Sequence, residues 1–228
     1  MRTTAVLPVK DFAAAKQRLA VGRASPAPGL SVEHRQSLAE AMFRDVLSAL
    51  ANVSPIDEVL VVTRGDGARR IARGRGLRVT PDDERGHNAA ALIGIEAAIS
   101  AGANRALLVP GDCPALDPSE LDRLLSRPVA PPSVLIVPDR HGTGTNALVL
   151  TPPGALAPSF GPGSCGRHTE TARAARVHAE VVVVPSLATD VDTPEDLEAL
   201  EASLVSADHA TATATRQTLS RLTLLSKC

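Results

Sequence analysis

The sequence of 228 residues contains no tryptophan or tyrosine and only three phenylalanines. Proteins that bind nucleic acid commonly stack bases on exposed aromatic rings and surround them with basic side chains. Here 24 Lys and Arg face 25 Asp and Glu, which gives a formal net charge of −1. The composition therefore argues against nucleic acid as a partner.

Cysteines and long apolar runs are also scarce. Cys113, Cys165 and Cys228 are too few and too scattered for a disulfide framework or a zinc knuckle, which favours a reducing compartment. No apolar run reaches the roughly 20 residues that a membrane-spanning helix needs, and the first residues lead straight into a strand-like segment rather than a signal peptide. We expect a cytoplasmic protein with no membrane partner. The sequence leaves the oligomeric state open, a homodimer included.

Two common nucleotide-binding motifs are missing. No G-x-G-x-x-G follows the first apolar run, and no G-x-x-x-x-G-K-[ST] occurs anywhere. The first absence argues against a dinucleotide-dependent oxidoreductase, and the second argues against a P-loop NTPase.

Short apolar runs alternate with amphipathic segments along the chain, a pattern typical of an α/β fold. Helices are predicted over 32–50 and 66–73, from 118, after the loop 159–168, and from 194. A further helix is predicted to end near Gly102, with Leu92, Ile95 and Ile99 as its buried stripe. Strands are predicted over 4–9, 57–63, 76–80, 106–110, 133–137, 147–150 and 180–185.

This alternation predicts a doubly wound, mostly parallel sheet with helices on both faces. The short connection between 133–137 and 147–150 predicts one antiparallel pair, and hence a mixed sheet. One domain is expected over residues 1–201. The Ala-, Thr- and Ser-rich tail, 202–228, is expected to be weakly ordered or a loosely docked helix.

Three aspartates follow predicted strands. Asp112 ends one apolar run, and Asp190 and Asp192 come after another. Ligands of open α/β sheets bind beyond the carboxyl ends of the strands, so these side chains are expected to meet there. Carboxylates without a Cys or His set suit Mg²⁺. The alternative is that Gly111-Asp112 only turns the chain and that Asp190 and Asp192 cap the helix that starts after Thr193.

Cationic and glycine-rich loops accompany these acids. Lys10, Lys16 and Arg18 follow the first strand, where fixed positive charge suits a polyphosphate, although a solvated charged loop is the alternative. The loops 138–146 and 159–168 combine glycines with hydroxyl side chains, which suits anion binding, and either can also be an ordinary turn. Arg167 and His168 are expected only as neighbours of a bound phosphate.

Five segments, in this order, resemble the guanylyltransferases that activate a three-carbon phosphoacid in biosynthesis of the deazaflavin coenzyme F-420: LPVKDFAAAKQRL, PGDCPALDPSEL, PDRHGTGTNALVL, SFGPGSCGRH and DVDTPEDL. Those enzymes are relatives of the molybdenum-cofactor nucleotidyltransferases. The resemblance implies a nucleotide-diphospho-sugar transferase-like fold and transfer of GMP from GTP to phosphoenolpyruvate or 2-phospho-L-lactate. Phosphoenolpyruvate is preferred because the Arg-, Ala- and Pro-rich composition resembles that of GC-rich actinobacterial genes.

The resemblance also implies roles for individual residues. Thr145, Gly161 and Ser164 would hold the phosphoacid, and the three aspartates would hold Mg²⁺. Gly86 and Asn88 resemble a nucleotide-side G-x-N loop, with Lys10 and Arg18 beside the triphosphate. Lys16 takes the place of the superfamily's phosphate-binding lysine. The chain departs from the superfamily in having Pro8-Val9-Lys10 where a G-x-G-x-R opening is usual.

In the implied reaction, a phosphate oxygen of the acceptor attacks the α-phosphorus of GTP in line, with Asp112 and Lys16 as catalytic residues. Three other acceptor classes stay open: 3-phosphoglycerate, a sugar phosphate and a pterin. A nucleotide sensor that has lost the chemistry is a further alternative.

Overall fold

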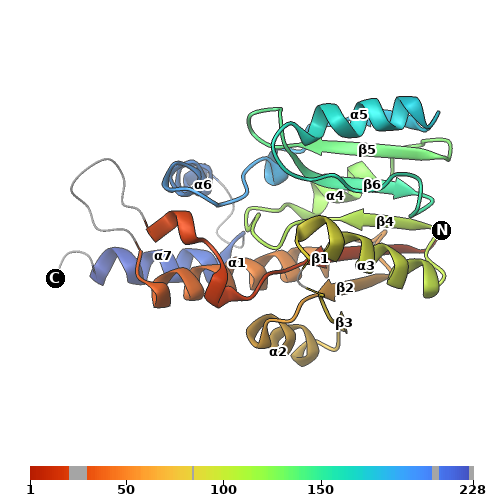
Figure 1. Cartoon of the computed structure of the whole chain (residues 1–228). Helices are drawn as coiled ribbons and strands as arrows, with labels where there is room; N and C mark the ends of the chain where they lie inside the picture. Colours follow the sequence, from red (N-terminus) through yellow and green to blue (C-terminus); the bar gives the residue numbers. More distant parts are fainter. Residues whose placement is uncertain (21–29, 84, 207–210, 226–228) are drawn as a thin grey trace.

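The computed structural model describes residues 1–20, 30–83, 85–206 and 211–225 (Figure 1). Seven strands form its sheet: β1 (Thr3–Pro8), β2 (Glu58–Val62), β3 (Arg78–Thr80), β4 (Arg105–Leu108), β5 (Ser133–Pro138), β6 (Thr145–Thr151) and β7 (His178–Val181). Their spatial order is β3-β2-β1-β4-β6-β5-β7. Strand β6 is antiparallel to both of its neighbours, and all other pairs are parallel. The predicted mixed, mostly parallel sheet is confirmed.

The described residues form seven α-helices: α1 (Val32–Leu50), α2 (Asp66–Gly74), α3 (His87–Ser100), α4 (Pro118–Leu125), α5 (Ser164–Ala174), α6 (Pro194–Ser206) and α7 (Thr213–Leu225). Buried side chains of α1, α2 and α4 pack on one face, and those of α3 and α5 pack on the other. The arrangement is doubly wound, as the alternating pattern predicts. None of the helices in the described part of the chain is long and apolar enough to cross a membrane.

Strand β1 occupies the middle of the parallel part of the sheet. All six of its residues are buried, and it pairs with β2 on one side and β4 on the other. Its alternate side chains enter the two cores, with Leu7 in the core under α1 and Val6 in the core under α3. A central strand of this kind delivers the residues that follow it to the middle of the sheet's carboxyl edge.

Helix α3 packs differently from its predicted stripe. Ile95 is buried, but Leu92 and Ile99 are 41% and 49% exposed. The helix instead meets the sheet through small residues, and a Cβ on Gly94 would lie 2.1 Å from Cγ1 of Val6. Close approach of the helix backbone leaves no room for a large side chain there, so the bulky residues turn outward.

The last predicted strand is also displaced. Strand β7 covers His178–Val181 rather than 180–185, and it is an edge strand that pairs only with β5. Val181 and Val183 are 48% and 71% exposed. The run of valines therefore predicts a strand, but this strand has a pairing partner on one side only, so it is not buried.

The C-terminal part holds more structure than the sequence predicts. Helix α6 continues to Ser206, so the predicted boundary at 201 falls inside it. Helix α7 lies along α1 (Figure 1). The buried carboxylate of Asp45 accepts hydrogen bonds from the backbone N–H groups of Ala214 and Thr215, at 3.0 and 2.8 Å, and from the Thr215 hydroxyl at 2.7 Å. This part of the tail is a docked, capped helix; residues 207–210 and 226–228 lie outside the described residues.

Candidate active site

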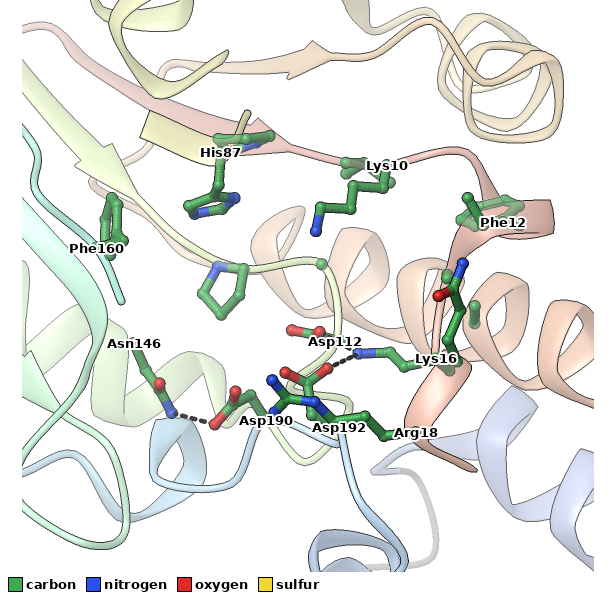
Figure 2. Close-up of a pocket in the computed structure, with 18 of the residues that line it drawn as sticks. Lys10, Phe12, Lys16, Arg18, His87, Asp112, Asn146, Phe160, Asp190 and Asp192 are labelled. Carbon is green, nitrogen blue, oxygen red and sulfur yellow. Dashed lines mark hydrogen bonds and ion pairs between the residues drawn. The ribbon is translucent and has the colours of Figure 1, made fainter. Parts of the chain in front are cut away.

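A cavity of about 570 Å³ opens at the carboxyl edge of the parallel strands (Figure 2). Because β6 runs in the opposite direction, its first residues lie at the same edge where β1 and β4 end. Eight of the eleven predicted site residues line the cavity: Lys10, Lys16, Arg18, Asp112, Thr145, Gly161, Asp190 and Asp192. The topology therefore collects residues from five separate parts of the chain.

The two acidic segments are held together by backbone and side-chain contacts. The N–H of Val191 donates to the carbonyl oxygen of Asp112 at 3.3 Å. The Lys16 ammonium, whose side chain is only 6% exposed, donates to the carboxylates of Asp112 and Asp192, the latter at 3.0 Å. Figure 2 shows this lysine entering between the two acids. One buried cation thus joins two carboxylates.

The charges in this cluster shift one another's pKa. Burial lowers the pKa of Lys16, but the charges of Asp112 and Asp192 outweigh burial and hold the pKa above its ordinary value. Burial and the same two carboxylates raise the pKa of Asp190 to about 6, although the Asn146 amide donates to it at 3.2 Å. Asp190 receives no ion pair from Lys16 to offset its charge. This corner of the cavity therefore favours additional positive charge.

Asp190 and Asp192 do not cap α6. Thr193 and Asp196 make a reciprocal capping box, in which the Thr193 N–H donates to the Asp196 carboxylate at 2.8 Å and the Asp196 N–H donates to the Thr193 hydroxyl at 3.3 Å. The N–H of Asp192 also donates to Asp196, at 3.1 Å. The helix start is satisfied without the carboxylates of Asp190 and Asp192, which leaves them to the cavity.

The donor set fits a hard divalent cation. Mg²⁺ is commonly held by one or two carboxylates together with water and substrate phosphates rather than by a closed protein cage. Within the described ranges no group of three or more His, Cys, Asp or Glu side chains is placed so that it could hold a metal ion without further ligands from substrate or water. Lys16 already pairs with Asp112 and Asp192, so a divalent cation would be held by one or two of the three carboxylates together with substrate phosphates and water.

Two further basic side chains reach the cavity. Lys10 follows β1 and projects into the cavity, and Arg18 lies beside Asp192 (Figure 2). Both are exposed, whereas Lys16 is buried. The loop that follows β1 therefore carries two cations with access to a ligand and one committed to the acidic cluster.

The predicted acceptor residues are placed unequally. Thr145 and Gly161 line the cavity, and Gly161 has φ 118°, a conformation that favours glycine. Ser164 does not line it. This residue begins α5, is fully buried, and its hydroxyl has no hydrogen-bond partner.

The predicted nucleotide-side loop makes structural contacts instead. Gly86 begins α3 with φ 103°, and Asn88 holds the backbone of Phe160 by accepting from its N–H at 2.7 Å and donating to its carbonyl at 3.3 Å. Neither residue lines the cavity. His87, which the sequence analysis did not single out, does line it and packs edge-on against Phe160 at 5.0 Å. Its only sequence signal is its place between Gly86 and Asn88.

Arg167 and His168 differ from the prediction of phosphate neighbours. The Arg167 guanidinium donates to the carbonyl oxygens of Ser159, at 2.9 Å, and Pro162, and so braces the glycine-rich loop. His168 is fully buried and both of its ring nitrogens are bonded within the protein. Neither residue lines the cavity.

Comparison with known proteins identifies the family. The model of the family described as "Guanylyl transferase CofC like" matches residues 3–224. The chain belongs to this family. It is a nucleotidyltransferase, and the resemblance drawn from its motifs is confirmed.

Individual relatives agree with this assignment. A phosphoenolpyruvate guanylyltransferase of Conexibacter woesei is 46% identical over 224 residues, which cover 97% of each chain. A 3-phospho-D-glycerate guanylyltransferase of Colwellia psychrerythraea is 37% identical over 202 residues, covering 88% of this chain and 91% of the relative.

A solved protein from Desulfovibrio desulfuricans G20, provisionally a nucleotide-diphospho-sugar transferase, has a TM-score of 0.76 at 16% identity, with 100% of this chain and 98% of that chain covered. This likeness confirms the predicted fold.

Proposed function

We propose that this guanylyltransferase transfers GMP from GTP to phosphoenolpyruvate and releases pyrophosphate, as a step in coenzyme F-420 biosynthesis. One observation carries the proposal: a single cavity brings the acidic cluster of Asp112, Asp190 and Asp192 together with Thr145 and Gly161. Such a cavity suits two phosphate-bearing substrates. The relative that is 46% identical is named for the same reaction.

The reaction forms one bond and breaks one. A phosphate oxygen of the acceptor attacks the α-phosphorus of GTP, and the bond from that phosphorus to the bridging oxygen of the β-phosphate breaks, so the electron pair leaves with pyrophosphate. No general base is needed, because a phosphate monoester with a second pKa near 6 is largely dianionic at neutral pH. The task of the chain is to align the two phosphates and to offset their charge.

Each group has a defined part in this alignment. Lys10 and Arg18 bind the triphosphate and offset charge that develops on the departing pyrophosphate. Lys16, which is paired with Asp112, adds positive charge from within the acidic cluster. Thr145 and Gly161 hold the acceptor, and Ser164, buried at the first position of α5, supports the glycine-rich loop from behind. Asp112, Asp190 and Asp192 would hold Mg²⁺, which supplies Lewis-acid neutralisation of the reacting phosphate oxygens when bound.

A second acceptor is supported by a specific observation. The Colwellia psychrerythraea relative is named a 3-phospho-D-glycerate guanylyltransferase and is 37% identical. Phosphoglycerate, phosphoenolpyruvate and 2-phospho-L-lactate all carry a phosphate and a carboxylate on three carbons. Phosphoenolpyruvate and 2-phospho-L-lactate carry the phosphate on C2 and differ in the C2–C3 double bond, whereas 3-phospho-D-glycerate carries its phosphate on C3 and a hydroxyl on C2.

Mass spectrometry of products separates these acceptors. The purified protein is incubated with GTP, Mg²⁺ and one of the three acids, and each mixture is analysed for the GMP adduct and for pyrophosphate. We expect the phosphoenolpyruvate adduct to form fastest. An adduct that forms only with phosphoglycerate or phospholactate refutes the proposed acceptor. If none of the three acids gives an adduct or releases pyrophosphate, the acceptor class is refuted.

A further inference from the structure

His168 links the two glycine-rich loops from inside the protein. The ring lies on α5 and is fully buried. Its Nε2 accepts a hydrogen bond from the backbone N–H of Ser159 at 2.8 Å, and its Nδ1 lies 3.1 Å from the hydroxyl oxygen of Thr145. Ser159 belongs to the loop before α5, and Thr145 begins β6 at the cavity.

These two contacts fix the position of the ring proton. A backbone N–H can only donate, so Nε2 must be the unprotonated nitrogen, and a neutral ring then carries its hydrogen on Nδ1. Burial, with a contribution from the charge of Arg167, lowers the pKa of His168 to about 4, so the ring is neutral at physiological pH. The Nδ1–H therefore donates to the Thr145 oxygen.

The direction of the Thr145 hydroxyl follows. Because its oxygen accepts from His168, its own hydrogen is left to donate elsewhere, and Thr145 lines the cavity. The phosphate and carboxylate of a phosphoacid present mainly acceptor oxygens at neutral pH, so the site that holds them must supply donors. A Thr145 hydroxyl that could rotate freely would donate to the acceptor's oxygens only part of the time.

We propose that His168 is a positioning residue that fixes Thr145 as a hydrogen-bond donor to the anionic oxygens of the acceptor. This inference deepens the proposed function and rests on its assignment of Thr145 to the acceptor. His168 acts from the side of the protein core and touches neither substrate. Phe160, edge-on to the His168 ring at 5.6 Å, extends the contact to the cavity wall.

Two variants separate the two hydrogen bonds. In H168N the side-chain amide reaches the place of Nδ1 and still donates to Thr145. In H168Q the amide reaches the place of Nε2 and still accepts from Ser159, but the donor to Thr145 is lost. We expect H168Q to raise KM for the acceptor about three- to tenfold, the range of one lost hydrogen bond, and to leave KM for GTP unchanged. H168N restores the acceptor KM to near the wild-type value.

A double-mutant cycle tests whether His168 acts through Thr145. T145V removes the hydroxyl, so H168Q should add little to the acceptor KM in the T145V background. H178Q, at an exposed histidine on the edge strand β7, is the matched control and should leave both KM values unchanged. Additive effects of H168Q and T145V, or equal effects of H168Q on both substrates, overturn the proposal.

The tautomer gives a readout that needs no substrate. Long-range ¹H–¹⁵N spectra of the wild-type protein should show His168 protonated on Nδ1, and protonation on Nε2 overturns the proposal even if the variants do not fold. The kinetic cycle uses whichever three-carbon phosphoacid the wild-type protein turns over. A preference for phosphoglycerate therefore refutes the proposed acceptor while the role of His168 is still tested.

Discussion

Lys16 and Asp192, 176 residues apart in the sequence, form an ion pair of 3.0 Å inside the cavity. The same ammonium also binds Asp112. The loop that follows β1 is therefore linked to the segment 190–192 through the Lys16 ammonium. Two of the three carboxylates that we propose would hold Mg²⁺ are therefore already paired with this lysine.

Removing this charge is expected to make the fold depend on the metal. K16M should lower the free energy of unfolding by roughly 1–2 kcal/mol, less than for a fully buried pair because Asp192 is half exposed. Saturating Mg²⁺ should stabilise K16M more than the wild type. Urea unfolding with and without Mg²⁺ measures both effects. R69M, at an exposed ion pair on α2, should change the unfolding free energy by less than about 0.5 kcal/mol. An equal response of K16M and wild type to Mg²⁺ counts against a shared site.

Asp112 is expected to be needed for turnover and not for folding. D112N keeps the size of the side chain but removes one carboxylate from the cluster, and kcat should fall about 100-fold or more. Pyrophosphate release from GTP measures the loss, and the free energy of unfolding should fall by no more than the roughly 1–2 kcal/mol expected for K16M, because Asp192 still pairs with Lys16. D66N, at an exposed carboxylate on α2, is the control. Metal-dependent release that survives in D112N shows that the metal assignment is wrong.

Asn88 should affect the acceptor more than the nucleotide. Both ends of its amide bind the backbone of Phe160, so N88A frees the glycine-rich loop and should raise KM for the acceptor about three- to tenfold. Steady-state kinetics with each substrate varied in turn gives the two KM values. A rise confined to GTP instead supports the nucleotide-side role that the motif resemblance implies.

Gly94 is expected to be indispensable for packing of α3. A Cβ there would lie 2.1 Å from Val6 and 3.0 Å from Val62, so G94A forces the helix away from the sheet and should cost about 1–3 kcal/mol. G74A is the matched control, because a Cβ at Gly74 meets nothing within 4 Å. Urea denaturation of both variants decides the point, and equal stabilities contradict the tight helix–sheet contact.

Protonation of His168 should destabilise the fold in mild acid. The pKa is about 4 in the folded protein against an ordinary value of 6.5, so the unfolded chain binds the proton first and stability falls as pH drops from 6.5 toward 4. Between about pH 7 and about pH 5 this group alone accounts for roughly 2 kcal/mol. H168N, which has no titrating ring, should lose correspondingly less over the same interval. Parallel pH dependences of wild type and H168N contradict the shifted pKa.

Local patterns predicted much of the fold. The repeat of apolar residues in 32–50 gave the bounds of α1, and the apolar runs marked the positions of every strand except β7. The face of α3 was mispredicted because the sequence shows which residues are bulky, but not that Gly94 brings the backbone against Val6. Helix α7 was underestimated because its cap, Asp45, lies 169 residues before Ala214. Such a partner has no local signature.

The sequence likewise predicts part of the site, namely the residues that directly follow strands. Residues that follow strands, such as Asp112 and Lys10, reach the cavity because the sheet's carboxyl edge gathers them. Asn88 and His168 could not be assigned in this way. Their partners, Phe160 and Thr145, are distant in sequence, and only the packing of α3 and α5 on the sheet reveals these contacts.

Strand β6 presents consecutive residues to opposite sides of the sheet, as any strand does. Thr145 contacts His168 on the α5 side, and Asn146 contacts Asp190 and the carbonyl of Leu187 on the other. Under the proposed function, the residue that would bind the carbon acid and the residue that holds Asp190 therefore lie on separate faces of one strand. We therefore expect a substitution on the Thr145 side of β6 to change the preference among small acids and to leave the Asn146–Asp190 contact in place.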